Sequence, residues 1–232
     1  MNDNSICNKK SMFYVIGTVL FSTLVMCLVD GVISPPYLYK SIIKIVLFLL
    51  IPFAYFLLFK GKSEHLKQLF KPKKRNLILS LLLGLGVFTV VMLAYVLLGD
   101  YIDLSSIKES LTSGVGVTAD NFVYVAIYIS FVNSLLEEFF FRGYAFLILK
   151  RECGRTFAYI FSSLTFAIYH VGMTSGWFNI FIYLLSMLGL FVGGSIFNYL
   201  NEKCESIYPS WIVHMCANFA INTIGFILFG II

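Results

Sequence analysis

Long apolar runs recur along almost the whole chain, and they restrict the folds that it can adopt. A helix needs about 20 predominantly apolar residues to cross a bilayer, and several runs in the 232 residues reach that length. Only 12% of the residues are charged, whereas about a quarter are charged in a soluble domain. We therefore expect an all-α fold, a polytopic membrane helical bundle.

The apolar runs predict seven transmembrane helices. They cover residues 12–33, 42–59, 77–98, 121–149, 156–173, 178–199 and 210–232. Pro35 and Pro36 are expected to end the first helix and Pro209 to begin the last, because proline lacks the N–H that a helix interior needs. We expect residues 1–120 to form three membrane helices and an outer loop, and residues 121–232 to form a catalytic core.

The basic residues predict the orientation of the helices. Most of the 17 lysines and arginines precede the first segment or lie in the connectors after the second, fourth and sixth. The other side holds only Lys40, Lys44 and Lys108. Basic residues mark cytoplasmic loops, so we expect a cytoplasmic amino terminus and an outer carboxyl terminus, in a bacterial cell membrane. Because the net charge of +5 is distributed by loop, we expect no nucleic-acid partner.

Several other residues are expected to pack or to face solvent. Small residues allow close helix contacts, and the candidates are Gly84, Gly86, Gly189, Gly193 and Gly194. The five cysteines are scattered without a Cys-x-x-Cys pair, so we expect packing residues rather than disulfides or metal ligands. We expect His65 to be a solvated loop residue and 99–120 to be a polar outer loop.

Ionisable side chains in the hydrocarbon region are costly, so each one needs an explanation. The segment 121–149 carries Glu137, Glu138 and Arg142. Glu138 and Arg142 are four residues apart and can neutralise one another as a structural ion pair. Glu137 lies about 100° further round the helix, and we expect its carboxylate to be unpaired.

Two later segments also carry polar side chains. His170 follows Phe166 by four residues in the fifth segment. The last segment has three polar residues at four-residue steps, which places them on one helix face: His214, Asn218 and Asn222. A single histidine or asparagine of this kind is usually a hydrogen-bonded packing residue. Together with Glu137, however, these groups could form a hydrolytic site.

Three motifs, each in its own membrane segment, resemble the motif set of one family. They are Glu-Glu-x-x-x-Arg at 137–142, Phe-x-x-x-His at 166–170 and His-x-x-x-Asn at 214–218. The set is similar to that of the CPBP family, which includes the type II CaaX prenyl endopeptidases and the Abi proteins linked to bacteriocin immunity. The resemblance covers roughly residues 121–222.

The resemblance implies an intramembrane endopeptidase that cleaves a membrane-associated protein or peptide. It implies that Glu137 and His170 activate water, and that His214 and Asn218 stabilise the tetrahedral oxyanion. The supporting motif positions are matched by Glu138, Arg142 and Phe166. These roles are chemically consistent, because peptide hydrolysis needs a base for water and donors for the developing oxyanion.

The cofactor requirement stays open at this point. Two histidines and a glutamate could bind a divalent metal such as zinc, with Glu137, His170 and His214 as ligands and Asn218 or water in the fourth position. The His-Glu-x-x-His signature is absent, and the resembled family is described both as metalloproteases and as glutamate-dependent proteases. We favour a site without metal.

Two other functions are alternatives to proteolysis. Intramembrane Glu, His and Arg also form the proton relays of transporters, although no inverted repeat is visible in the sequence. A bacteriocin-immunity or partner-binding protein in the same membrane would need no catalysis at all.

The predicted depths of the site residues set a geometric condition. Glu137 and His170 lie about 20 Å along their helices from the charged connector between them, whereas His214 lies only about 7.5 Å beyond Pro209. For these residues to meet, either the fourth and fifth helices extend beyond the bilayer or the connector 200–209 dips inward.

Overall fold

Helices make up the fold of this chain. The computed structural model describes residues 9–59, 63–72, 74–99, 104–174 and 180–232, and no strand occurs within these ranges. Seven helical stretches are long and apolar enough to cross a membrane: Lys9–Ile33, Tyr37–Leu58, Asn76–Leu98, Phe122–Cys153, Arg155–Thr174, Ile180–Cys204 and Tyr208–Leu228. The predicted all-α bundle of seven spans is confirmed, and the span ends differ from the predicted ones by only a few residues.

Several spans contain π-helical turns, which hold one extra residue per turn. The α-helices within the spans are α1 (Lys9–Leu28), α2 (Tyr37–Ile45), α3 (Ile51–Leu58), α5 (Lys74–Leu98), α7 (Phe122–Ile127), α8 (Ser134–Glu137), α9 (Leu147–Glu152), α10 (Arg155–Tyr169), α11 (Val171–Thr174), α12 (Ile180–Cys204) and α13 (Tyr208–Leu228). The first span ends at Ile33, just before the two prolines, and Pro209 lies in the first turn of α13, as predicted.

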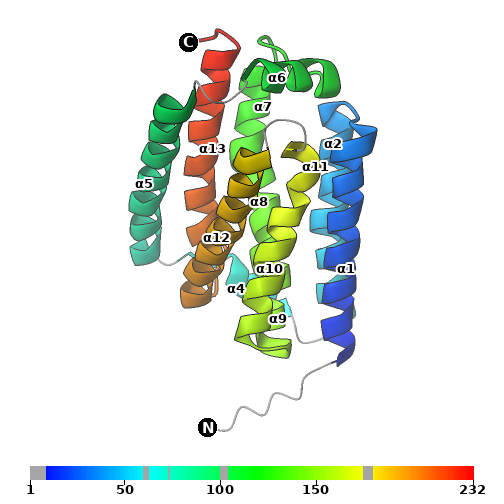
Figure 1. Cartoon of the computed structure of the whole chain (residues 1–232). Coiled ribbons are helices and arrows are strands. Elements are labelled where there is room, and N and C mark those ends of the chain that lie inside the picture. The colour runs from blue at the N-terminus through cyan, green and yellow to red at the C-terminus, as the bar shows by residue number, and fades with distance from the viewer. Residues whose placement is uncertain (1–8, 60–62, 73, 100–103, 175–179) are drawn as a thin grey trace.

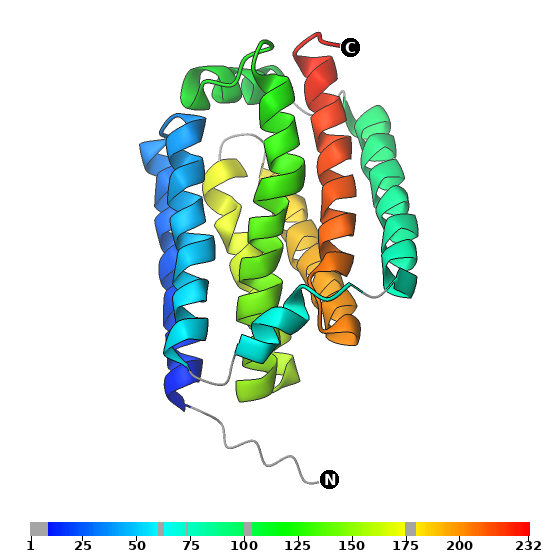
Figure 2. The ribbon, with the colours of Figure 1, turned by 180° about the vertical axis from the view of Figure 1, so that it is seen from behind.

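The span Phe122–Cys153 forms the centre of the bundle. Figures 1 and 2 show it from opposite sides, with α1 to α3 on one flank and α13 and α5 on the other. Every residue from Leu136 to Leu149 is buried, and the ring of Phe140 stacks on that of Phe48 with centroids 4.1 Å apart. A single apolar core therefore joins the helices on both sides of residue 120.

The outer helices have the opposite polarity to those of a soluble protein. In α12 the inward side chains include Asn198 and Asn201, which are both fully buried, whereas Phe181 and Leu185 are exposed. Lipid chains are as apolar as leucine, so exposed apolar side chains carry no penalty there. The polar side chains of α12 bond inside the protein instead, for example Asn201 Nδ2 to Ser210 Oγ at 2.6 Å.

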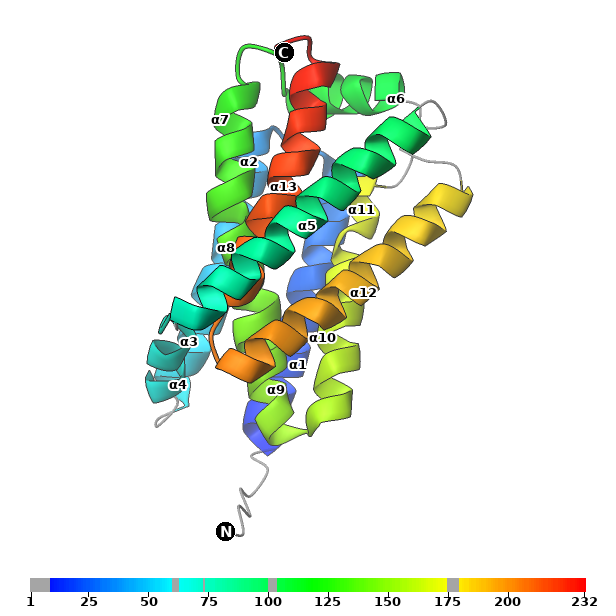
Figure 3. The ribbon, with the colours of Figure 1, turned by 90° about the vertical axis from the view of Figure 1, so that its left-hand side faces the viewer.

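Only some of the predicted glycine contacts are present. A Cβ at Gly84 would lie 2.6 Å from Cys216 Sγ, so Gly84 lets α5 approach α13 closely, and Figure 3 shows α5 crossing α13 there. Gly194 is less tight: a Cβ there would lie 3.3 Å from Ser163 Cα and 3.4 Å from Arg142 Nη2. The prediction is wrong for the other three glycines, which have open space around them: Gly86, Gly189 and Gly193.

The described cysteines form no disulfide with one another. They are Cys27, Cys153, Cys204 and Cys216, and the fifth, Cys7, lies outside the described residues. Cys204 and Cys216 are buried within the bundle. Cys204 accepts a hydrogen bond from Asn76 Nδ2 at 2.7 Å, so it joins α12 to α5.

The turn between α12 and α13 lies inside the protein. Ser206 and Ile207 are 1% and 0% exposed, and both bond to the carbonyl oxygen of Leu69 at 3.0 Å. Leu69 ends the short helix α4 (Ser63–Leu69). Figure 1 shows this turn higher in the bundle than the turn between α9 and α10. The connector thus dips inward while the fourth and fifth spans extend past it, which brings the three site helices to one level.

Two predicted loops are in fact helical. His65 lies in α4 and contacts the guanidinium of Arg151, so its prediction as a solvated loop residue is wrong. Within 99–120, α6 (Leu104–Glu109) continues into a π-helical turn and lies across the end of the bundle that carries the carboxyl terminus (Figure 1). Val117, only 2% exposed, packs in a cluster with Phe122 and Phe229. Burial of this apolar side chain explains why the segment folds back onto the helices.

Candidate active site

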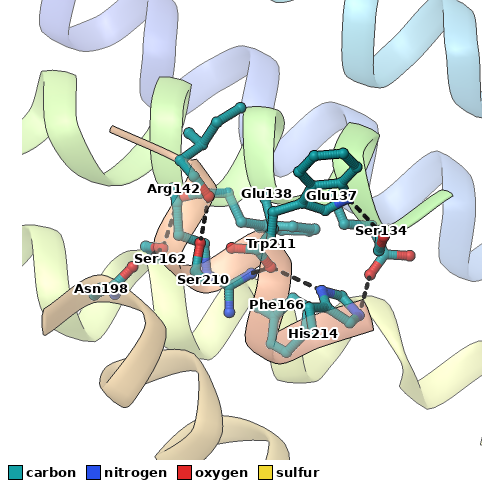
Figure 4. A network of polar contacts seen from close by, with 12 residues as sticks. Ser134, Glu137, Glu138, Arg142, Ser162, Phe166, Asn198, Ser210, Trp211 and His214 are labelled. Atoms are coloured by element: carbon teal, nitrogen blue, oxygen red, sulfur yellow. Dashed lines mark hydrogen bonds and ion pairs between the residues drawn. The ribbon is translucent and has the colours of Figure 1, made fainter. Parts of the chain in front are cut away.

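The structure brings the predicted site residues of three spans together at the middle of the bundle. Glu137 and Glu138 lie near the midpoint of the central span, His170 ends α10, and His214 is on α13. Glu137 is 2% exposed and His214 8%. Figure 4 shows the His214 ring with one contact to each of the two glutamate carboxylates.

One oxygen of Glu137 is fully occupied by donors. Its Oε1 accepts hydrogen bonds from Asn133 Nδ2 at 2.8 Å, Tyr169 OH at 3.1 Å and Lys44 Nζ at 3.2 Å. The prediction that Glu137 is unpaired is therefore wrong. The prediction that Lys44 lies on the outer side is also wrong, because it treats every basic residue as a topology signal. Lys44 lies two turns into its span and is 5% exposed.

The other oxygen of Glu137 is in a different situation. Glu137 Oε2 is buried and has no hydrogen-bond partner among the described residues. His214 Nε2 lies 3.8 Å from it. A buried carboxylate oxygen normally has a partner, and this separation is too long for a direct hydrogen bond. A water molecule placed to one side could bond both atoms at once.

His214 is held by the second glutamate. Its Nδ1 lies 2.8 Å from Glu138 Oε1, and Arg142 Nη1 lies 3.4 Å from the same oxygen. The predicted Glu138–Arg142 ion pair is confirmed, with His214 as an additional member that the sequence did not reveal. A carboxylate can only accept, so this contact places a proton on Nδ1 of His214. The ring then presents Nε2 toward Glu137.

Arg142 is stabilised mainly by aromatic rings. It is 0% exposed, and its guanidinium carbon lies 4.0 Å from the Phe166 ring centroid and 5.0 Å from that of Phe197. A desolvated cation over an aromatic face gains about 2 kcal/mol or more. Phe166 therefore supports the site by covering the arginine, while Gly194 leaves the space that the guanidinium fills.

One ring nitrogen of His170 is bonded within its own span. Its Nδ1 lies 2.8 Å from the carbonyl oxygen of Phe166, four residues earlier in α10. A carbonyl oxygen can only accept, so Nδ1 carries the proton and Nε2 keeps its lone pair. Glu137 interacts electrostatically with both His170 and His214. His170 is thus placed as an acceptor of protons near the carboxylate.

The asparagines of α13 bond to the central span. Asn218 Nδ2 donates to the carbonyl oxygen of Ile129 at 3.2 Å, and Asn222 Nδ2 donates to that of Ala126 at 3.2 Å. His214 and these two residues thus face the same neighbouring helix, as their four-residue spacing predicts. Each carboxamide has two N–H groups, so Asn218 keeps a second donor beyond its bond to Ile129.

The predicted metal ligands do not form a metal-binding group. Within the described ranges, no three His, Cys, Asp or Glu side chains are arranged to hold a metal ion. Glu137, His170 and His214 are therefore not gathered into such a group in this structure, and no reaction step is assigned to a metal.

Three members of the site were not predicted from the sequence. They are Lys44, Asn133 and Tyr169. Asn133 precedes Glu137 by four residues, and Tyr169 adjoins His170, so helix periodicity could have indicated the first. A lysine within an apolar run, as at position 44, is itself a signal of a buried partner.

A comparison with known protein families matches part of the chain. Residues 119–220 match a family described as type II CAAX prenyl endopeptidase Rce1-like. This segment is therefore similar to the Rce1-like family. The match confirms the resemblance to the CPBP family and makes a CAAX-type intramembrane protease the class of protein to which the chain is similar. Neither a curated protein nor a solved structure matches the chain.

The Rce1-like segment holds most of the candidate site. Glu137, His170, His214 and Asn218 all lie within residues 119–220. Lys44 lies outside it, on the second span. The amino-terminal helices thus contribute a charged group to a site that the family segment otherwise supplies.

Proposed function

We propose that this protein is an intramembrane endopeptidase that hydrolyses a peptide bond of a membrane-associated protein or peptide. The observation that carries the proposal is the buried Oε2 of Glu137, which lacks a hydrogen-bond partner within the described part of the chain and faces His214 Nε2 at 3.8 Å. A carboxylate oxygen in such a position is suited to accept a proton from water. The family match of residues 119–220 supports the same reaction class.

The proposed reaction begins with water between Glu137 and the histidines. Glu137 Oε2 takes one proton from the water, with His170 Nε2 as a second acceptor close by, and the water oxygen bonds to the carbonyl carbon of the substrate. The carbonyl oxygen then carries the negative charge. His214 enters the proposed reaction with both ring nitrogens protonated and keeps both protons throughout; its Nε2–H and the second N–H of Asn218 are the proposed donors to this oxyanion, since donors aimed at developing charge lower the barrier.

Breakdown of the tetrahedral intermediate completes the cycle. The C–N bond breaks, and the proton held by Glu137 passes to the leaving nitrogen, so that an amine and a carboxylic acid are released. Glu137 returns to its ionised form. Glu138 and Arg142 take no part in these transfers, and their proposed role is to hold His214 in place through Nδ1.

We also propose that the amino terminus is cytoplasmic. Lys9, at the start of α1, lies at the same end of the bundle as α4 and the α9–α10 turn (Figure 1). The basic connectors that follow the second and fourth spans therefore share one side. An excess of Lys and Arg marks the cytoplasmic side of bacterial membrane proteins.

The test uses the purified full chain in proteoliposomes with membrane-tethered peptides. The peptide set includes prenylated CAAX sequences and unmodified transmembrane peptides, and mass spectrometry detects new termini. Wild-type protein is expected to cleave at least one class, and Glu137→Gln none. Glu64→Gln, on the exposed helix α4, is the matched control and is expected to cleave normally. Absence of cleavage by the wild-type protein on every class would refute the proposal.

The same assay tests metal dependence. If water is activated by Glu137 without metal, activity persists after dialysis against a strong chelator. Loss of activity that added zinc restores would show that a metal is required, and would assign Glu137 to metal binding instead.

A further inference from the structure

The buried lysine of the second span is not used by the proposed reaction. Lys44 is near the end of α2, and its side chain is 6% exposed. Its ammonium contacts Glu137 Oε1 and Asn133 Oδ1, and lies 5.0 Å from the centroid of the Tyr169 ring. A lysine is costly at this depth, so these contacts need an explanation beyond folding of the apolar core.

The contacts of Lys44 act on only one side of the Glu137 carboxylate. Lys44, Asn133 and Tyr169 all donate to Oε1, and they come from three different spans. A carboxylate held at one oxygen by three donors cannot rotate without breaking several hydrogen bonds. The second oxygen is therefore fixed in its position opposite His214.

We propose that Lys44 is a positioning residue for the reaction: its ammonium fixes Glu137 through Oε1 so that Oε2 points at the water site beside His214. The proposal rests on the proposed proteolytic function. It also means that the site is incomplete without the amino-terminal helices, because Lys44 lies outside residues 119–220. The competing explanation is an ion pair that merely stabilises the fold.

A second lysine on the same helix, which is partly buried, provides a matched control. Lys40 Nζ lies 2.6 Å from Asp30 Oδ1, with side chains 12% and 1% exposed. This pair is one helical turn from Lys44 and makes none of the hydrogen bonds described for Glu137. Lys40→Met therefore removes an ammonium from a buried ion pair without disturbing the proposed catalytic carboxylate.

The kinetic test compares turnover per folded molecule. Both Lys44→Met and Lys40→Met are expected to lower stability, since each leaves a buried carboxylate unpaired. Only Lys44→Met is expected to lower kcat, by about 10²-fold, the usual effect of misplacing a catalytic group by about 1 Å. Its KM should stay within about threefold, because Lys44 does not touch the substrate.

Chemical rescue separates positioning from packing. In Lys44→Ala, added ethylamine can occupy the vacated space and supply an ammonium, so turnover is expected to rise with amine concentration. Ethanol, similar in size and uncharged, should not restore it. Equal kcat values for folded Lys44→Met and Lys40→Met, or equal rescue by ethanol, would overturn the positioning role.

A measurement without proteolysis keeps this inference distinct from the proposed function. We expect Lys44→Met/Glu137→Gln to unfold at a higher temperature than either single variant, because the double replacement leaves no unpaired charge. If the stabilities of the variants show this coupling but the wild-type protein cleaves no peptide, the proposed proteolytic function is refuted and the contact between Lys44 and Glu137 is not. Absence of the coupling would refute the Lys44–Glu137 pair itself.

Discussion

Replacing Arg142 by methionine tests how the buried charges hold the site together. Arg142 is fully buried, and Arg142→Met would leave the Glu138 carboxylate without its cation. Breaking a buried ion pair on one side costs about 3–5 kcal/mol, and loss of the guanidinium from the Phe166 ring adds about 2 kcal/mol. His214 stays 2.8 Å from Glu138 and can take up a proton, which offsets part of the loss. We therefore expect a net loss of about 3–5 kcal/mol.

This loss is measured by thermal unfolding of the purified protein in detergent. For a chain of this size the midpoint should fall by on the order of 10 °C. Lys67→Met is the control, because Lys67 pairs with Glu64 on exposed α4 at 2.7 Å and is expected to have no measurable effect. The double variant Glu138→Gln/Arg142→Met should recover part of the stability. A midpoint for Arg142→Met that matches the control would refute this account of the buried pair.

Three further predictions concern other parts of the molecule. Asn218→Ala should lower kcat by about 10²–10³-fold with little change in KM if its second N–H binds the oxyanion. A loss of stability with an unchanged kcat would instead indicate that Asn218 has only a packing role. Gly84→Ala should destabilise the protein by about 1–3 kcal/mol in denaturant unfolding. Adding Cys216→Ala should restore part of this stability, since the added Cβ would meet Cys216 Sγ; a double variant as unstable as Gly84→Ala would contradict the contact. In a cysteine-free background, Lys67→Cys should react only with reagents that reach the cytoplasm and Ser106→Cys only from outside; labelling of both from one side would reject the topology.

The sequence predicts the spans well because the bilayer imposes a length and a composition on each. It also predicts the pairing of Glu138 with Arg142 and the shared face of His214 and Asn218, because both follow from helix periodicity within one segment. Periodicity gives no information about which span lies opposite. The contact between His214 and Glu138 therefore appears only in the structure.

The partners of Glu137 on other spans likewise cannot be predicted from helix periodicity. Lys44 is far from Glu137 in the sequence, and a rule that counts lysines as topology signals assigns it to the surface. The packing of the second span against the central span, with the Phe48 ring stacked on that of Phe140, places the two together in the core. The inward position of the α12–α13 turn is likewise a tertiary effect, since it depends on hydrogen bonds from Ser206 and Ile207 to Leu69.

The buried central span has a consequence for how the protein is made. Phe122–Cys153 carries Glu137, Glu138 and Arg142, and each charge near a helix centre opposes entry into the membrane by a few kcal/mol. Lys44 is synthesised before this span and His214 after it. The nascent span can pair Glu137 with a lysine already in the membrane, whereas Glu138 has only Arg142 until the last helix arrives. Truncation before α13 should therefore leave a central span that enters the membrane poorly and is removed by quality-control proteases.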